Sequence, residues 1–200
     1  MIMLTEKLHN YQLILASQSP RRQLLLRGLD IPFEVITIPN IDESFPTNLK
    51  ENEIAIYLSE QKAKAYKNIQ NNNSIVITAD TIVWFNNMVL NKPVNREDAI
   101  QMLQKLSNQM HIVYTGVSIT SFEKQKTFCS ETKVWFRELK LKDIEYYVDH
   151  YKPYDKAGAY GAQEWIGYVA IRKIEGSYFN VMGLPVQQLY SELEQFIINK

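Results

Sequence analysis

The chain has 200 residues, a formal net charge of zero and 46% hydrophobic residues, which suits one domain, or one domain of two lobes, with a sizeable core. Zero net charge argues against a broad basic surface for nucleic acid and against an acidic tail, although a local basic pocket remains compatible with it. The single cysteine, Cys129, excludes an intramolecular disulfide, and no Cys/His cluster has zinc spacing. We interpret Cys129 as a structural thiol.

The ends of the chain and its apolar runs favour a cytoplasmic protein. Residues 1–10 lack the apolar centre of a signal peptide, because Glu6 and Lys7 lie in their middle. No apolar run approaches the ~18 residues needed to span a bilayer. We therefore expect a soluble protein that does not enter a membrane.

Apolar periodicity and turn residues predict strands and helices that alternate along the chain. In chain order, the expected elements are a strand over 13–16, a helix over 20–28, a β-rich segment over 33–38, a polar loop over 41–48, an amphipathic helix over 51–69, a turn over 71–74, a strand over 75–85, a hairpin turn at 86–87 leading into 89–90, a helix over 96–107 capped by Asn95, strands over 111–122 and 126–136, a helix over 143–151, an ordered loop over 153–163, a strand over 168–174 and a helix over 185–198. The alternation predicts an α/β domain, and the long central strands predict a mixed sheet.

The first candidate site lies where a strand runs into a proline-led helix. Ser19 is a favourable N-cap and Pro20 suits the first helical position, so the helix begins where the strand ends. A helix start favours a bound anion, and Arg21 and Arg22 add charge-assisted hydrogen bonds that suit phosphate. The hydroxyls of Ser17 and Ser19 add two donors. The alternative is a capped surface helix with solvated arginines.

The second candidate site is Asp80, towards the end of the apolar run that begins at residue 75. Ligands of open α/β sheets gather at the carboxyl ends of such strands. A carboxylate there could bind a divalent metal or deprotonate a water; alternatively it hydrogen-bonds a nearby turn. Lys62 lies near the apolar stripe of the predicted helix over 51–69. Its side chain either extends to solvent or points towards a bound anion.

Three further segments offer ligand groups. Lys92, at a strand end just before a helix, can reach a phosphate unless it is a surface lysine. Glu43, beside Asp42 in a polar loop, is an oxygen ligand for a hard cation unless both acids are solvated. The glycines of residues 155–163 let the backbone approach a ligand closely, unless the loop is structural. Gln163 offers one donor and one acceptor that can match the edge of a nucleobase.

Taken together, these groups suit a nucleotide phosphohydrolase, with cations for phosphates, carboxylates for a metal and a water, and an amide for a base. The chain has no Gly-x4-Gly-Lys-Ser/Thr loop and no Gly-x-Ser-x-Gly elbow. His9, His111 and His150 are scattered and form no ligand pair, so we interpret them as structural or solvated.

The chain resembles the Maf (septum formation) family of nucleoside triphosphate pyrophosphatases over about residues 11 to 195. Each motif is short, but their order and spacing together are highly specific. The motifs, in the family's order, are Ser17-Gln18-Ser19-Pro20-Arg21-Arg22, Asp42-Glu43, Lys62-Ala63-Lys64, Ala79-Asp80-Thr81, Lys92-Pro93, Asp155-Lys156-Ala157-Gly158-Ala159-Tyr160-Gly161-Ala162-Gln163, Glu175-Gly176-Ser177-Tyr178 and Gly183-Leu184-Pro185.

The resemblance implies a Maf/ITPase-like α/β fold: one domain over residues 1–200, with a mixed, bent sheet flanked by helices and two lobes around a central cleft. It implies hydrolysis of a nucleoside triphosphate to the monophosphate and pyrophosphate with a divalent metal, Mg²⁺ or Mn²⁺. By motif, Asp80 is the general base, and Glu43 and Asp80 hold the metal. The residues implied to hold the phosphates are Ser17, Ser19, Arg21, Arg22, Lys62 and Lys92. A homodimer is implied in the same way.

Two motifs, Ala79-Asp80-Thr81 and the segment over residues 155–163, have the form found in the branch of the family that acts on dTTP and UTP. The branch that acts on 7-methyl-GTP differs at both places. Arg22, Thr81 and Gln163 would carry this selectivity, with Gln163 pairing with N3–H and O4 of uracil or thymine. An amide can flip, so Gln163 by itself does not exclude cytosine. Glu164 follows Gln163 where the family commonly has glycine. We expect this acid to narrow the base pocket or to change base preference.

Three hypotheses from different classes follow. The leading one is a house-cleaning enzyme that hydrolyses dTTP, UTP or modified pyrimidine nucleotides. The alternative is a nucleotide-binding regulator of septation or cell division that needs no turnover, against which the presence of Asp80, Lys62 and Lys92 speaks. The third is a nucleic-acid-binding protein that uses Arg21 and Arg22, against which zero net charge and scattered aromatic residues argue.

Overall fold

The computed structural model describes residues 3–69 and 71–198. The chain divides into two compact units. Unit 1 comprises Met1–Asp80, Thr115–Ser130 and Gly183–Lys200, and unit 2 comprises Thr81–Tyr114 and Glu131–Met182. Three long strands supply residues to both units, and they are β3 (Ser74–Phe85), β5 (Met110–Thr120) and β6 (Gln125–Phe136). The other strands are β1 (Gln12–Leu15), β2 (Glu34–Val35), β4 (Met88–Leu90) and β7 (Ile171–Gly176). The seven-stranded mixed sheet has the order β2-β1-β3-β5-β6-β7, with β4 paired antiparallel to β3.

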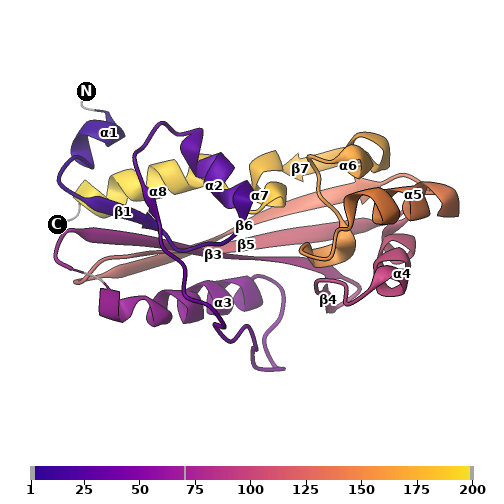
Figure 1. Ribbon diagram of the computed structural model, residues 1–200, viewed down its shortest axis with the longest axis horizontal. Helices are drawn as coiled ribbons and strands as arrows, with labels where there is room; N and C mark the ends of the chain where they lie inside the picture. The colour runs from indigo at the N-terminus through magenta and orange to yellow at the C-terminus, as the bar shows by residue number, and fades with distance from the viewer. Residues whose placement is uncertain (1–2, 70, 199–200) are drawn as a thin grey trace. The chain divides into compact units, whose positions relative to one another are not determined.

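Unit 1 consists of strands covered by helices on both faces. Its other elements are α1 (Leu4–Lys7), β1 (Gln12–Leu15), α2 (Pro20–Arg27), β2 (Glu34–Val35), α3 (Asn52–Ala65), the 3-10 turn η1 (Lys67–Ile69) and α8 (Val186–Ile198). β1 pairs in parallel with β2 and with β3, where Leu13 faces Ile75 and Leu15 faces Ile77. α3 covers one face of these strands and α8 covers the other (Figure 1). Unit 1 is thus an α/β/α layer structure.

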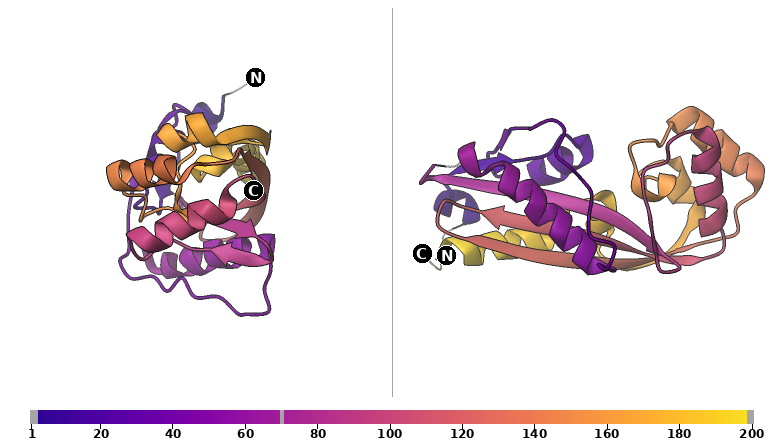
Figure 2. Two further views of the ribbon diagram at one scale, coloured as in Figure 1. Left: turned by 90° about the vertical axis from the view of Figure 1, so that its right-hand side faces the viewer. Right: turned by 90° about the horizontal axis from the view of Figure 1, so that it is seen from below.

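Unit 2 has its own helices and its own core. Its other elements are β4 (Met88–Leu90), α4 (Arg96–Leu106), α5 (Leu141–Tyr151), the 3-10 turn η2 (Ala157–Ala159), α6 (Trp165–Ala170), β7 (Ile171–Gly176) and α7 (Tyr178–Met182). α4 and α5 pack side by side (Figure 2). Their fully buried side chains Leu103, Leu106, Ile144 and Val148 belong to one apolar cluster that includes Val134 of β6. Burial of this cluster favours the folded unit because apolar surface is removed from water.

Several elements follow directly from local residue chemistry. Ser19 caps α2, with its Oγ accepting the Arg22 N–H at 3.5 Å, and Pro20 is the first helical residue. Asn95 caps α4, with Oδ1 accepting the Asp98 N–H at 2.9 Å. Asn86 and Asn87, between β3 and β4, both have positive φ, as the common two-residue hairpin turn requires. The predicted α/β fold with a mixed sheet is therefore confirmed.

Other local predictions are wrong. The strand predicted over 168–174 begins only at Ile171, because Tyr168 and the two residues after it belong to α6. Tyr168 and Val169 favour strands in general, but Ile166 and Ala170 bury the same face of a helical turn. The β-rich segment over 33–38 forms only the two-residue strand β2. The helix predicted over 51–69 ends at Ala65 and is followed by η1.

His111 in β5 makes unit 2 sensitive to acid. Its side chain is buried, its Nε2 lies 2.7 Å from the Tyr160 hydroxyl, and burial lowers the pKa of the imidazole from 6.5 to about 3. The unfolded chain therefore binds a proton near pH 6.5 while the folded chain does not, so stability falls as the pH drops from 6.5 towards 3. We expect the free energy of unfolding to lose about 2 kcal/mol from this residue between pH 7.5 and pH 5.

Urea unfolding of the wild type and of His111→Gln at pH 7.5 and pH 5 measures this contribution. The variant should lose less stability than the wild type between the two pH values. His150→Gln is the control, because His150 is exposed on α5, where its Nδ1 lies 2.7 Å from the Tyr146 carbonyl oxygen. Equal losses in the wild type and in His111→Gln would contradict the expectation.

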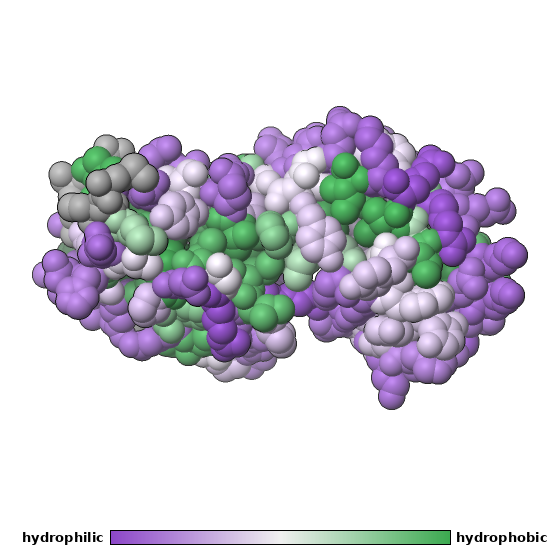
Figure 3. All heavy atoms as spheres, turned by 90° about the horizontal axis from the view of Figure 1, so that it is seen from above, coloured by the Kyte–Doolittle hydropathy of each residue, from purple (hydrophilic) through white to green (hydrophobic). Residues whose placement is uncertain are grey.

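Some apolar side chains reach the surface. Leu24 of α2 is 61% exposed and Tyr168 of α6 is 84% exposed. On the face shown in Figure 3, hydrophobic residues lie among hydrophilic ones in both units. Exposed apolar side chains of this kind are normal on folded proteins. Among the described residues, no helix combines the length and the apolar character needed to cross a bilayer.

Candidate active site

In the segment that joins β1 to α2, serine hydroxyl groups accept hydrogen bonds from nearby backbone N–H groups. Ser17 is buried, and its Oγ accepts the Ser19 N–H at 3.2 Å. The Ser17 carbonyl oxygen accepts Nε2 of Gln23 at 3.3 Å. The first turn of α2 therefore begins at a fixed place directly after β1. The partial positive charge of a helix start favours a nearby anion.

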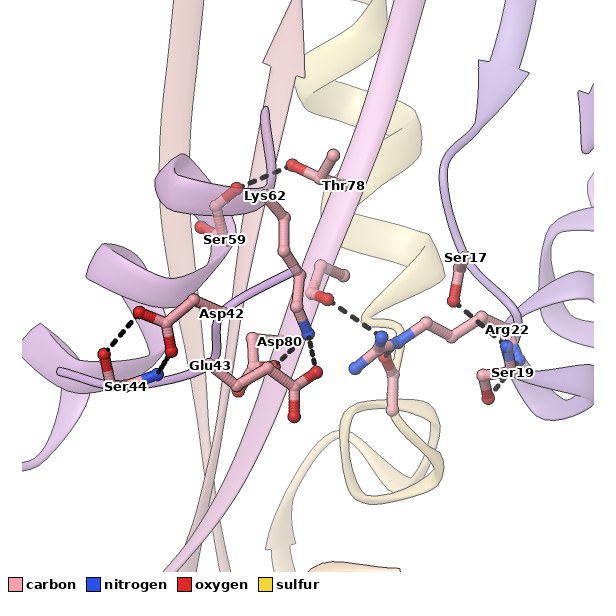
Figure 4. Close-up of polar contacts among 12 residues, drawn as sticks. Ser17, Ser19, Arg22, Asp42, Glu43, Ser44, Ser59, Lys62, Thr78 and Asp80 are labelled. Atoms are coloured by element: carbon pink, nitrogen blue, oxygen red, sulfur yellow. Dashed lines mark hydrogen bonds and ion pairs between the residues drawn. The ribbon is translucent and has the colours of Figure 1, made fainter. Parts of the chain in front are cut away.

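Arg22 anchors α2 to two other segments of unit 1. Its Nε donates to the Gly183 carbonyl oxygen and its Nη1 donates to the Ala79 carbonyl oxygen, each at 2.8 Å (Figure 4). Burial lowers the pKa of the guanidinium, and the nearby Asp80 and Glu43 carboxylates partly offset that effect. Arginine keeps its charge in proteins. A fixed positive charge therefore lies beside the end of the apolar part of β3.

A lysine and two carboxylates of unit 1 form a cluster of charged side chains, which we call the centre. Lys62 Nζ lies 2.5 Å from Asp80 Oδ1 and 2.8 Å from Glu43 Oε1. Figure 4 shows the lysine of α3 reaching between the acid of β3 and the acid of the segment before α3. The side chains of Lys62 and Asp80 are 13% and 12% exposed, whereas that of Glu43 is 47% exposed. The centre is therefore shielded on the sheet side and reachable beside Glu43.

α3 is held in place by hydroxyl groups that the sequence reasoning missed. Thr78, two residues before Asp80 on β3, donates from Oγ1 to the Ser59 carbonyl oxygen at 2.8 Å. Ser59 lies three residues before Lys62, and its Oγ is 3.1 Å from the Ser118 Oγ of β5. These buried contacts fix the position of α3 along the sheet. The only signal in the sequence was that polar residues occur inside otherwise apolar runs.

The neighbouring acid Asp42 has a local role. Its carboxylate accepts the Ser44 N–H at 2.9 Å and the Ser44 hydroxyl at 2.7 Å. These hydrogen bonds hold the pKa of Asp42 below its usual value. The two acids of the motif are therefore used differently, because Glu43 turns to Lys62 while Asp42 closes a turn.

The carboxylate oxygens of the centre are ligands of the type that suits a hard divalent cation which also binds a substrate phosphate. Among the described residues, no group of three or more His, Cys, Asp or Glu side chains could hold a metal. One carboxylate oxygen of Glu43 and one of Asp80 lie close to each other, since both contact Lys62 Nζ. Mg²⁺ is commonly bound by one or two carboxylates and completed by water and substrate phosphates. These two acids match that mode rather than an all-protein metal site.

In unit 2, the structure brings the predicted glycine-containing loop to β3 and to the segment that carries Lys92. The Gly158 N–H donates to the carbonyl oxygen of Asn91, the residue before Lys92, at 3.2 Å. A Cβ at Gly158 would lie 3.0 Å from the side chain of Val83, two residues after Thr81 on β3. Gly158 also has a φ of 69°. The glycine is required here both by its backbone conformation and by the close approach to β3.

Gln163 and Glu164 lie at the end of this loop. The Gln163 Oε1 is buried and has no hydrogen-bond partner among the described residues. Glu164 is engaged on both oxygens: Oε1 lies 3.0 Å from Lys156 Nζ, and Oε2 accepts the Tyr147 hydroxyl. Sequence reasoning singled out Gln163 and expected Glu164 to act on the base pocket. It did not anticipate that Lys156 and Tyr147 bind this acid.

The fold and the site together define a class: a mixed α/β protein in which Lys62, Asp80 and Glu43 form a lysine–carboxylate cluster close to Arg22, in the first turn of α2. The particular family follows from sequence comparison. The family model described as Maf-like protein matches residues 12–196, and the chain belongs to this family.

The chain is similar over nearly its whole length to curated relatives. A dTTP/UTP pyrophosphatase of Phocaeicola vulgatus is 53% identical over 190 residues, which cover 95% of this chain and 98% of the relative. A dTTP/UTP pyrophosphatase of Parabacteroides distasonis is 52% identical over 191 residues, which cover 96% and 99%. The solved nucleoside-triphosphatase / dITP/XTP pyrophosphatase of Mycobacterium abscessus is 12% identical, covers 62% of this chain and 72% of that chain, and has a TM-score of 0.41.

Proposed function

We propose that this protein hydrolyses dTTP and UTP to the nucleoside monophosphate and pyrophosphate. The observation that carries the proposal is the centre formed by Lys62, Asp80 and Glu43 beside Arg22. Such a centre places cationic side chains that can bind a polyphosphate next to a carboxylate that can deprotonate a water molecule. The two similar relatives are dTTP/UTP pyrophosphatases, which supports the proposal.

In the proposed reaction, Asp80 acts as the general base. Its carboxylate takes a proton from water while the water oxygen forms a bond to the α-phosphorus. The bond from the α-phosphorus to the oxygen that bridges to the β-phosphorus breaks, and its electron pair leaves with pyrophosphate. General bases of this kind contribute about 10²–10⁴-fold to rate.

The remaining residues would bind and orient the triphosphate. We assign the phosphates to Ser17, Ser19, Arg21, Arg22, Lys62 and Lys92. Positioning and charge stabilisation supply most of the catalysis in phosphoryl chemistry. Glu43 and Asp80 would hold a divalent cation, Mg²⁺ or Mn²⁺, which when bound neutralises phosphate charge. When the cation and the triphosphate bind, Lys62 would exchange a contact with a carboxylate of Glu43 or Asp80 for a contact with a phosphate.

We assign base selectivity to Arg22, Thr81 and Gln163. The buried, unpartnered Oε1 of Gln163 supports this assignment, because an acceptor without a donor costs about 1–3 kcal/mol and favours a ligand that supplies one. The N3–H of uracil and thymine is such a donor. We also place the protein in the cytoplasm, where its proposed substrates are made and used.

The test is pyrophosphate release by the purified protein from dTTP, UTP, CTP, GTP and 7-methyl-GTP, with Mg²⁺, with Mn²⁺ and with a chelator. We expect preferred turnover of dTTP and UTP that the chelator abolishes. Preferred turnover of another nucleotide would keep the reaction and overturn the base assignment. Tight nucleotide binding without any turnover would overturn the enzymatic proposal.

A further inference from the structure

Tyr147 of α5 connects two parts of the loop over 155–164. The Tyr147 side chain is fully buried, and its hydroxyl donates to Glu164 Oε2. The same hydroxyl accepts the Gly161 N–H at 3.0 Å. One residue of a helix therefore fixes both the middle of the loop and its final acid. Burial and the hydrogen bond to Glu164 raise the pKa of Tyr147, so the hydroxyl keeps its proton and continues to donate.

Glu164 is also fixed by a buried cation. Lys156 Nζ lies 3.0 Å from Glu164 Oε1 and 2.7 Å from Asp155 Oδ1, and the lysine side chain is 9% exposed. Buried charges are stable when they are paired and hydrogen-bonded, and removing one partner of such a pair is strongly unfavourable. The Glu164 carboxylate is thus held in one place by Lys156 and Tyr147.

The Glu164 carboxylate and the Gln163 amide nitrogen share the space beside Gly161. A Cβ at Gly161 would lie 2.9 Å from Glu164 Oε2 and 3.1 Å from Gln163 Nε2. A negative charge at this place attracts the amide N–H groups and repels the amide oxygen. The amide is therefore expected to keep its nitrogen towards Glu164 and its oxygen away from it. That oxygen is the buried atom without a partner among the described residues.

We propose that Glu164 and Tyr147 are positioning residues that fix the orientation of the Gln163 amide and thereby make the protein prefer uracil or thymine over cytosine. This inference rests on the proposed function. With the orientation fixed, Gln163 Oε1 accepts the N3–H of uracil or thymine. Cytosine presents an acceptor at N3 and leaves this oxygen unpaired. If the amide could rotate freely, its N–H group would pair with that acceptor and the discrimination would decrease.

The experiment measures kcat and KM for UTP and CTP in the wild type, Glu164→Gln and Tyr147→Phe. Glu164→Gln keeps the size of the side chain but removes its charge. Tyr147→Phe removes only the hydroxyl. We expect both variants to lower the ratio of kcat/KM for UTP to kcat/KM for CTP by about tenfold, as a modest loss of orientational preference would produce. Most of the change should appear as a lower KM for CTP relative to UTP.

Two matched variants serve as controls. Tyr146→Phe changes the adjacent, exposed tyrosine of α5, and Glu138→Gln changes an exposed glutamate of unit 2. Both should keep the wild-type ratio. Thermal melting shows which proteins are folded, and Glu164→Gln decides the outcome if Tyr147→Phe does not fold.

The possible outcomes separate the two proposals. A purely structural role for Glu164 and Tyr147 would lower turnover of both nucleotides and leave the ratio unchanged, which would overturn the inference. A wild type that does not distinguish UTP from CTP would also overturn it. A wild type that hydrolyses no nucleotide would instead overturn the proposed function, on which the inference rests.

Discussion

Asp80→Asn is expected to lower the rate of pyrophosphate release from UTP by about 10²–10⁴-fold. Asparagine has nearly the same shape but does not accept a proton from water at neutral pH. Lys62 keeps its contact with Glu43, at 2.8 Å, so the fold of unit 1 should persist. The loss should appear mainly in kcat, because the substitution leaves unchanged Arg22 and the start of α2, to which we assign the phosphates. Steady-state kinetics with Mg²⁺, together with a thermal melt, measures both effects.

Asp42→Asn is the matched control for this experiment. Asp42 is one residue from Glu43, but its carboxylate is exposed and hydrogen-bonded to Ser44. It should retain activity within about twofold of the wild type, since exposed substitutions away from a site have small effects. An Asp80→Asn protein that kept wild-type turnover would show that another group accepts the proton.

Gly116→Ala is expected to lower the free energy of unfolding by more than about 3 kcal/mol, above the usual cost of overpacking. A Cβ at this position of β5 would lie 2.1 Å from the Ala55 carbonyl oxygen and 2.7 Å from the Ile56 nitrogen. These are backbone atoms of α3, which cannot rotate away as a side chain can. The helix must therefore move off the sheet. Because the same helix carries Lys62, activity should fall with stability.

Urea unfolding monitored by circular dichroism tests this expectation, and Gly28→Ala provides the control. Gly28, at the end of α2, has a helical φ of −65°, and a Cβ there would meet only carbonyl oxygens of its own helix, the nearer at 3.3 Å. The free energy of unfolding of Gly28→Ala should stay within about 1 kcal/mol of the wild-type value. If Gly116→Ala unfolded at the wild-type urea concentration, the close packing of α3 on β5 would be wrong.

The elements that sequence reasoning predicted well depend on the residues' own backbone preferences. Ser19 and Pro20 begin α2, and Asn86 and Asn87 form a turn with positive φ, because neighbouring residues alone decide these conformations. Tyr168 shows the limit of the approach. Its β propensity predicted a strand, but packing of the helix α6 overrides propensity, as tertiary context often does.

The candidate site shows the same division. The sequence indicated Lys62, Asp80 and Glu43 first by residue type and position and then through a family resemblance, and each residue by itself also had an ordinary structural explanation. The structure places the three together, although they come from a helix, a strand and a loop. Thr78 and Ser59, which hold that helix against that strand, were missed because a buried hydroxyl has no sequence pattern of its own.

The sequence by itself determined the α/β class, the caps and turns, the family, and the residue types available for phosphate, metal and base. These depend on local conformational preference and on motif order, both of which are carried by neighbouring residues. Only the tertiary structure decided that Lys62 lies between two carboxylates, that Arg22 binds the backbone at Ala79 and Gly183, and that Glu164 is held by Lys156 and Tyr147. Most of those contacts join residues distant in the chain, and their geometry is set by tertiary packing rather than by any local preference.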